Sequence, residues 1–346
     1  MIMRTTYFRV ISVILTLLLI AVPHHLKSQG NCSSTLQRAE TLFDQGIIEE
    51  IPSLLAGCIM DGFTGEERKR AQKLTILAYI FDNKISLAEN TMISFLQDNP
   101  EYEVQPDDPS EFVSLLRNFR TFPYLSIGIL MGGNLTSATM LATYGPFNPG
   151  FDENYFEIMP EIQAGAAVSI FLVESLELNI EGIYTRNSFA HNIQYPFAEV
   201  RKKETHQRIE LPVSLSYDLP MGRTTPYIRI GAFYSHLLSA RASYSVSNPE
   251  TGPDIIDKSD NQNILDRRNS GMVKGILGAG IKYKIPAGQI FFDLRYSHGF
   301  TEPVNAGNRW DQETTFRYYH TDGDFQLDNL SFSIGYRYLF YRTKKR

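Results

Sequence analysis

Two serine–histidine neighbours are the residues of this chain that could support nucleophilic catalysis. His236 follows Ser235, and His298 follows Ser297. A histidine can activate a serine hydroxyl only when the two side chains meet, yet neighbouring residues of a strand point to opposite faces. The sequence also contains no nucleophile elbow, metal-ligand spacing or phosphate-binding loop. We therefore predict no enzymatic activity, no catalytic residues and no cofactor-binding residues.

A run of aspartates between residues 247 and 270 could hold a calcium ion, because carboxylate oxygens are its preferred ligands. The spacing of these residues does not match an EF-hand loop. The same segments are rich in Asn, Asp, Gly and Ser, which is typical of exposed loops. We therefore predict no metal site at these aspartates, which are Asp254, Asp257, Asp260 and Asp266.

A larger group of charged residues occupies alternate positions within strand-like segments, on the face opposite the apolar side chains. Such residues would point into the interior if these strands closed into a barrel. An eight-stranded barrel has an interior that side chains fill, so buried charges are expected to pair with one another rather than to line an ion path. The predicted interior network comprises Glu177, Glu181, Glu210, Arg229, Lys274, Lys282, Asp293, Arg295 and Arg337.

The last strand shows most clearly how these side chains would be positioned. Between residues 327 and 341, large apolar residues alternate with Ser, Gly and Arg, which is the period-two pattern of a pleated strand. A continuous apolar face beside a polar one is typical of a strand with one side in lipid. A soluble lipocalin-type barrel would show the inverse pattern, with its apolar face inside. The apolar positions are Leu330, Phe332, Ile334, Tyr336, Tyr338 and Phe340.

Eight such segments are predicted, and the gaps between them alternate between long and short. The long gaps are residues 139–158, 196–205, 247–270 and 304–326. This alternation is the signature of an outer-membrane up-and-down barrel. Tyrosines near the strand ends fit two interfacial girdles, formed by Tyr124, Tyr217, Tyr227, Tyr283 and Tyr338 at one end and by Tyr184, Tyr234 and Tyr296 at the other. The strands are residues 124–138, 159–173, 175–195, 206–219, 226–246, 271–285, 289–303 and 327–341.

Several short motifs in these strands resemble the small eight-stranded outer-membrane proteins of the OmpA/OmpX type, and most closely the PorT-like barrels of Bacteroidota. The resemblance covers residues 124–341 and implies the architecture, but little about activity, because that family is functionally mixed. The chain departs from it in its added helical region and its basic C-terminal tail. The motifs lie at residues 126–128, 132–134, 176–177, 211–213, 278–280 and 330–336.

The N-terminal third has a different composition. Residues 1–30 have the basic start and apolar run of a signal peptide, although a retained anchor helix is the alternative. Residues 31–123 contain 15 acidic and 8 basic residues, against 23 and 22 in residues 124–346, which indicates two domains. In an oxidising envelope Cys32 and Cys58 could form a disulfide, or they could remain free thiols.

Residues 31–105 contain short amphipathic helices that loosely resemble tetratricopeptide-like hairpins. Ser33 could cap the first of these helices, and Thr64 with Glu67 has the spacing of a capping box. Such a domain could dock a partner or could be a compact helical cap without a ligand. Residues 106–123 are predicted to be a proline-rich linker with one short helix, and residues 342–346 a basic tail. Arg117 and Arg120 could contact lipid headgroups or simply solvent.

The predicted fold is therefore α+β and multidomain: a small all-α domain of helical hairpins in the periplasm, followed by an eight-stranded antiparallel transmembrane barrel in the outer membrane. With an even number of strands, both the helical domain and the C-terminus would be periplasmic. The expected partners are outer-membrane lipid and a protein bound by the helical domain, and not nucleic acid. The predicted function is an accessory or scaffold subunit of an envelope secretion or assembly machine. The alternative is a stand-alone porin-like or adhesion barrel that acts through its outer loops.

Overall fold

A computed structural model describes residues 29–146, 154–219, 221–247, 255–286 and 288–346. The predicted signal peptide, residues 1–30, lies outside the described residues except for Gln29 and Gly30, which belong to the first described helix. The chain divides into two compact units. The helical unit extends to Thr121 and includes Arg342–Arg346, and the barrel unit is Phe122–Tyr341.

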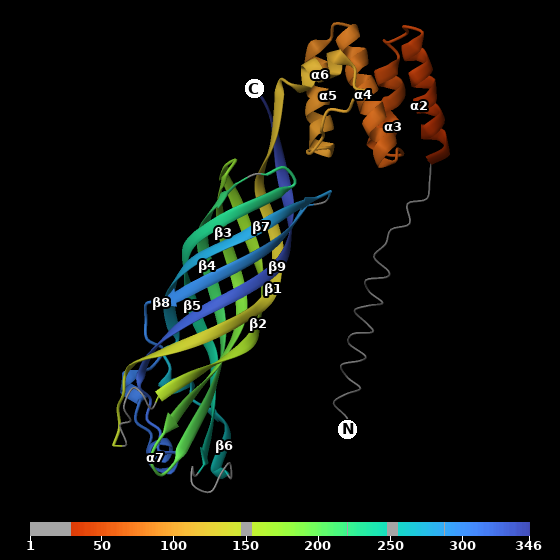
Figure 1. The fold of residues 1–346 in the computed structure, drawn as a ribbon. Helices are drawn as coiled ribbons and strands as arrows, with labels where there is room; N and C mark the ends of the chain where they lie inside the picture. The colour runs from red at the N-terminus through yellow and green to blue at the C-terminus, as the bar shows by residue number, and fades with distance from the viewer. Residues whose placement is uncertain (1–28, 147–153, 220, 248–254, 287) are drawn as a thin grey trace. The chain divides into compact units, whose positions relative to one another are not determined.

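In its described residues the helical unit contains five helices, which are joined by short turns except for the longer segment between α5 and α6 (Figure 1). Thr64 caps α4 with a capping box, since its side chain accepts from the backbone of Glu67 while the Glu67 carboxylate accepts from the backbone of Thr64. Gly46 (φ 76°) and Asn83 (φ 55°) adopt left-handed conformations in the turns after α2 and α4. The helices are α2 (Gln29–Asp44), α3 (Ile51–Met60), α4 (Gly65–Phe81), α5 (Ile85–Asp98) and α6 (Ser110–Leu116).

Helix α4 lies at the centre of this unit because it is apolar on two sides. Ala71, Leu74 and Ala78 pack with α2 and α3 in one hydrophobic cluster. Ile76 and Leu77 pack with α5, α6 and the start of β1 in a second cluster. Because α4 is buried on two faces, it does not show the single apolar stripe that is typical of a surface helix. Among the described helices, none is both long and apolar enough to cross a membrane.

The C-terminal residues 342–346 belong to the helical unit, and most of them are strand rather than a separate basic tail. Strand β9 continues to Lys345, whose Nζ lies 2.6 Å from a carboxylate oxygen of Glu89. The backbone N–H of Arg346 donates to the carbonyl oxygen of Asn118. Composition suggested that these basic residues form a tail. In the structure they are held by strand pairing and by an ion pair.

The described residues of the barrel unit form one antiparallel sheet of nine strands, in the order β4-β3-β2-β1-β9-β8-β7-β5-β6, which the β4–β5 pairing closes into a ring. Strand β6 lies outside the ring of the other eight strands, because it pairs with β5 beyond the point where β7 begins (Figure 1). The strands are β1 (Phe119–Ala142), β2 (Asn154–Val173), β3 (Leu176–Gln194), β4 (Glu199–Asp218), β5 (Thr224–Ser247), β6 (Ile255–Asn263), β7 (Gly271–Ile285), β8 (Gly288–Gly299) and β9 (Asp324–Lys345).

We call the end where the chain enters β1 and leaves β9 the terminal end, and the opposite end the distal end. Connections at the terminal end are short, as between Val173 and Leu176 or between Ile285 and Gly288. Three of the four connections at the distal end are longer, and these contain β6, the 3-10 helices η2 (Leu265–Arg267) and η3 (Ala306–Asn308), and α7 (Gln312–Arg317), whereas the β3–β4 connection between Gln194 and Glu199 is short. The predicted alternation of short and long gaps is thus present at three of the four distal connections, and the prediction of a long gap between β3 and β4 is wrong.

Side chains alternate between the interior and the outer surface, in the orientation that the sequence pattern predicts. Leu330, Phe332 and Ile334 of β9 are exposed on the outer surface, whereas Ser333 and Arg337 are buried inside. Most of the predicted girdle tyrosines are exposed, but Tyr227 is buried in the interior. Residues two positions apart on a strand point to the same face. Tyr227 lies two residues before the inward-facing Arg229, so its side chain also points into the interior.

Some strands extend beyond their predicted ends, at positions where the outward-facing side chains are polar. Strand β4 begins at Glu199, so the predicted loop 196–205 is mostly strand, and β1 begins at Phe119 within the predicted linker. The predicted loop 247–270 contains β6 and η2. Above the apolar band, the outer positions of β4 are Gln207, Thr205 and Lys203, which resemble a loop in the sequence although their backbone pairs with β3 and β5. Backbone pairing does not require an apolar outer face where that face meets water.

Candidate functional sites

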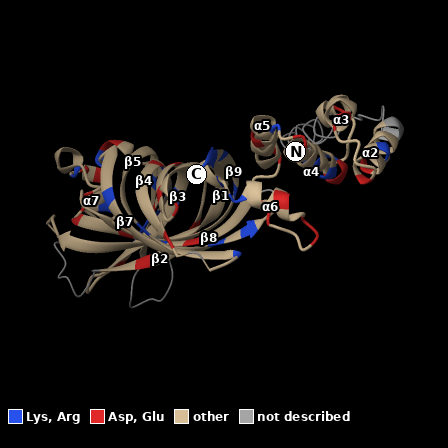
Figure 2. Ribbon diagram, turned by 90° about the horizontal axis from the view of Figure 1, so that it is seen from above, with Lys and Arg blue, Asp and Glu red and all other residues tan. Residues whose placement is uncertain are grey.

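Lysines and arginines lie among aspartates and glutamates along the strands of the barrel (Figure 2). Four of these charged residues fill the interior near the terminal end, and we call them the terminal quartet: Glu177, Asp218, Lys282 and Arg337. The guanidinium of Arg337 donates to both carboxylate oxygens of Glu177, at 2.8 and 3.0 Å. Lys282 donates to Glu177 at 2.8 Å and to Asp218 at 2.5 Å. The quartet carries two positive and two negative charges, so each buried charge has an opposite partner. Asp218 was not among the predicted interior residues.

A second group, the central quartet, lies one step further into the barrel and consists of Glu181, Arg229, Asp293 and Arg295. Glu181 accepts hydrogen bonds from both arginines, with Arg295 Nη2 at 3.0 Å from Oε1. Arg229 Nη1 also lies 3.4 Å from Asp293, which in addition accepts from Arg295 Nε. All four residues are buried. Here too the charges balance, and the arginines link three strands that are distant in sequence.

A cavity of about 20 Å³ separates these two quartets. It is lined by Glu181 and Arg229 from one quartet and by Lys282 and Arg337 from the other. A cavity of this size holds about one water molecule. Side chains therefore occupy the interior at this level, as the strand number predicts.

The remaining predicted residues, Glu210 and Lys274, lie further toward the distal end, with Arg208. We call these three residues the basic triad. Ser235 donates to Glu210 at 3.5 Å, and the Lys274 ammonium lies 5.9 Å from the ring centre of Phe233. All three members of the triad are buried, at 7% exposure or less. The structure thus places Glu210 and Lys274 in the interior but outside the two quartets.

The distal end contains a further network that the sequence did not reveal, the distal quartet of Lys202, Glu204, Arg268 and Asp322. Arg268 donates to both acids, at 3.0 Å from Nε to Glu204 and 2.9 Å from Nη1 to Asp322. Lys202 also contacts both acids. Lys202 and Glu204 fall on the polar part of β4 that resembles a loop, and Arg268 and Asp322 lie in distal connections, so period-two alternation could not identify them.

The sequence matches a known family over most of the barrel unit. Residues 110–303, more than half of the chain, match the outer membrane protein beta-barrel domain family. The chain belongs to this family. The protein is thus an outer-membrane β-barrel, and its exposed apolar band, with Leu211, Val213 and Leu215 on β4, is the lipid-facing surface.

Several solved structures are similar to this chain at low sequence identity. Neisserial surface protein A is 11% identical, with 62% of this chain and 97% of that chain covered and a TM-score of 0.31. The outer membrane protein OprG from Pseudomonas aeruginosa is 10% identical, with 63% and 97% covered and a TM-score of 0.32. The outer membrane protein AlkL is 13% identical, with 69% and 96% covered and a TM-score of 0.30. No curated protein matches the sequence.

The serine–histidine neighbours of this outer-membrane barrel lie on opposite faces of their strands. Ser235 and Ser297 are buried in the interior, whereas His236 and His298 are on the outer surface. His298 contacts Asp328 at 3.0 Å. Neither serine therefore meets the histidine that follows it.

The aspartates considered as calcium ligands do not form a cluster in the described part of the chain. Asp257 pairs with Arg317, at 2.7 Å between Oδ2 and Nε. Asp254 lies outside the described residues. No group of three or more potential metal ligands occurs among the residues that the structure describes.

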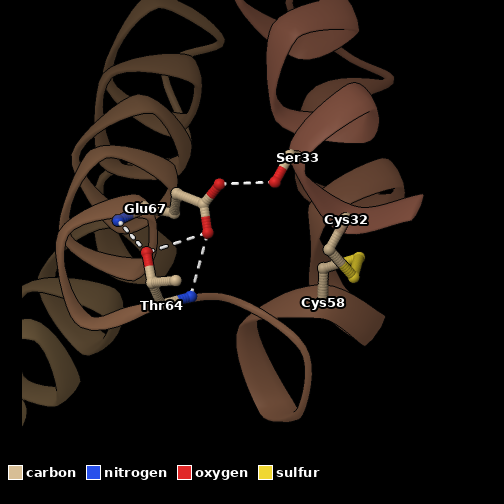
Figure 3. The surroundings of a disulfide bond; sticks show 5 residues. All are labelled: Cys32, Ser33, Cys58, Thr64 and Glu67. Atoms are coloured by element: carbon tan, nitrogen blue, oxygen red, sulfur yellow. Dashed lines mark hydrogen bonds between the residues drawn. A yellow bond between two sulfur atoms is a disulfide. The ribbon is translucent and has the colours of Figure 1, made fainter. Parts of the chain in front are cut away.

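The helical unit is stabilised at one end by a disulfide between Cys32 of α2 and Cys58 of α3, which resolves the choice between a bond and free thiols (Figure 3). Beside it, Ser33 donates to the carboxylate of Glu67, the residue that completes the capping box of Thr64. Ser33 was expected to cap α2, but this helix begins at Gln29. The serine instead links α2 to the start of α4.

A second polar contact fixes the segment between α5 and α6. Asp108 accepts from Lys73 and from the Tyr102 hydroxyl, both at 2.6 Å. Burial acts to raise the pKa of Asp108, but the hydrogen bonds from Lys73 and Tyr102 outweigh it and lower the pKa below the usual value. The carboxylate is therefore charged at neutral pH and ties this segment to α4.

Proposed function

We propose that the barrel anchors the helical unit on the periplasmic side of the outer membrane, where this unit binds a protein partner. In this proposal the protein is a non-enzymatic accessory or scaffold subunit of an envelope secretion or outer-membrane assembly machine. The observation that carries it is the helical unit itself, which has two hydrophobic clusters and a disulfide of its own. A domain stabilised in this way can present a fixed surface to a partner.

The interior of the barrel supports an anchoring role. Ion-paired side chains fill it at the terminal and central quartets, and the space between them is about 20 Å³. A solute path would need a wider lumen than eight strands provide. This argues against the small-porin alternative.

The connections between strands support the proposed orientation. Outer-membrane barrels have short periplasmic turns and longer extracellular loops. The terminal end has the short turns, so we assign it to the periplasm, and the distal end with β6 and α7 to the cell exterior. The helical unit precedes β1 and would then be periplasmic.

The turn between α4 and α5 offers an apolar surface for a partner. Phe81 and Ile85 are 53% and 43% exposed, and the Phe81 ring lies 5.9 Å from that of Phe43. Ile47, just after α2, is 45% exposed. Clustered apolar side chains of this kind mark interaction surfaces more often than single exposed residues do.

The test is affinity purification of the tagged full-length protein from native membranes in mild detergent. We expect a stoichiometric partner that is lost from the double variant Phe81→Ser with Ile85→Ser. Met60→Ser is the matched control, because Met60 is 83% exposed but lies at the end of α3. A protein that purifies alone, or a partner that is retained by the double variant, would refute the proposal.

A second candidate function is adhesion through the distal end. It is favoured by the buried core of that end, where Tyr244, Val246, Ile264 and Tyr318 pack in one cluster above the lipid-facing band. A structured outer surface can present a fixed binding face. Cell-binding assays with the distal connections exchanged would test this candidate.

A further inference from the structure

The basic triad differs from the three quartets in its charge. Arg208 and Lys274 are positive and Glu210 is negative, so the triad has an excess of one positive charge. Each quartet, in contrast, has two positive and two negative charges. Arg208 and Lys274 are each 1% exposed. A buried charge without a counter-charge is strongly unfavourable.

The guanidinium of Arg208 also lacks hydrogen-bond acceptors. Neither Nη1 nor Nη2 has a partner among the described residues, although both atoms are buried. Every arginine of the quartets, in contrast, donates to at least one carboxylate, as Arg268 does to Glu204 and Asp322. A buried donor without an acceptor is rare in proteins.

The carboxylates near the triad are already engaged. Glu210 interacts electrostatically with both Lys274 and Arg208, and it accepts from Ser235. Asp328 of β9 also attracts Lys274, but its carboxylate accepts from the Tyr296 hydroxyl at 2.8 Å on the outer side of the barrel. Glu204 also attracts Arg208, but it is bound by Lys202 and Arg268. None of these acids accepts a hydrogen bond from the Nη atoms of Arg208.

Polar side chains from several strands lie near the level of Arg208, together with the apolar Leu237, its register partner on β5. Arg208 is paired in register with Thr185 of β3. Asn329 of β9 donates to Asn187, while its own Oδ1 has no partner among the described residues. His206, the next inward residue of β4, contacts the distal quartet instead. The interior at this level is thus polar enough to hold an ion.

We propose that a small monovalent anion of the halide class binds inside the barrel at Arg208 and Lys274. One negative charge would balance the triad and would accept from the free Nη atoms of Arg208. A small ion is favoured because the interior of an eight-stranded barrel is filled by side chains. The site goes beyond the proposed function, because it concerns the barrel interior and not the helical unit.

The direct test is crystallography of the full-length protein with bromide in place of chloride. We expect an anomalous difference peak beside the Arg208 guanidinium and the Lys274 ammonium. Bromide peaks confined to the protein surface, with only water at the triad, would overturn the proposal. This measurement uses the unaltered protein and does not depend on whether a variant folds.

A second test measures urea unfolding at constant ionic strength while chloride replaces gluconate. Each tenfold rise in chloride above its dissociation constant should raise the folding equilibrium constant about tenfold. Arg208→Gln should abolish this dependence. Arg229→Gln, which removes a guanidinium from the central quartet, should retain it. An equal chloride dependence in the wild type and in Arg208→Gln would refute the assignment.

Discussion

Replacing Glu181 by glutamine removes the charge that holds the central quartet together. The carboxylate of Glu181 accepts from Arg229 and Arg295, and all three residues are buried. Glutamine has nearly the same shape, so the change isolates the charge. It leaves two guanidinium groups with Asp293 as their remaining carboxylate in the quartet.

The expected loss of stability is about 3–5 kcal/mol, the range for breaking a buried ion pair by removing one partner. Glu157→Gln is the matched control. Glu157 contacts Arg201 at 2.6 Å, but the two side chains are 46% and 47% exposed. An exposed pair contributes up to about 1 kcal/mol. The structure thus predicts a clear difference between two identical substitutions.

The assay is urea unfolding of the barrel in lipid vesicles, followed by the shift in gel mobility between folded and unfolded forms. Both variants are compared with the wild type at one pH and one ionic strength. If Glu181→Gln were destabilised no more than Glu157→Gln, the assignment of a charge-balanced interior would be wrong.

Two further predictions concern the helical unit. Replacing Cys32 and Cys58 by serine should destabilise this unit by about 3.5 kcal/mol, from the loop entropy of a 26-residue separation, and limited proteolysis should show faster cleavage there with the barrel intact. The second prediction concerns pH. Because the pKa of Asp108 is lowered on folding, its contribution is present above about pH 4, near the unfolded pKa, and is lost as the pH falls through the folded pKa. Hydrogen exchange between pH 5 and pH 2 should show this loss in the wild type but not in Asp108→Asn.

The sequence by itself determined the lipid-facing pattern of the barrel and the helical character of the N-terminal third. Alternation along a strand has a period of two, so residues such as Leu211 and Val213 share a face whatever the partner strands are. The capping box at Thr64 is likewise local, because its two residues are three positions apart. Features of this kind depend on neighbours in the chain.

Only the tertiary structure decided which charges meet. Glu181 lies 48 residues from Arg229 and 114 from Arg295, and closure of the sheet brings them together. Lys202 and Asp322 are 120 residues apart, and the polar part of β4 gave no sign of an interior position. The sequence placed charges on inward faces, but the level of each side chain in the barrel depends on strand register, which is set by pairing between distant segments.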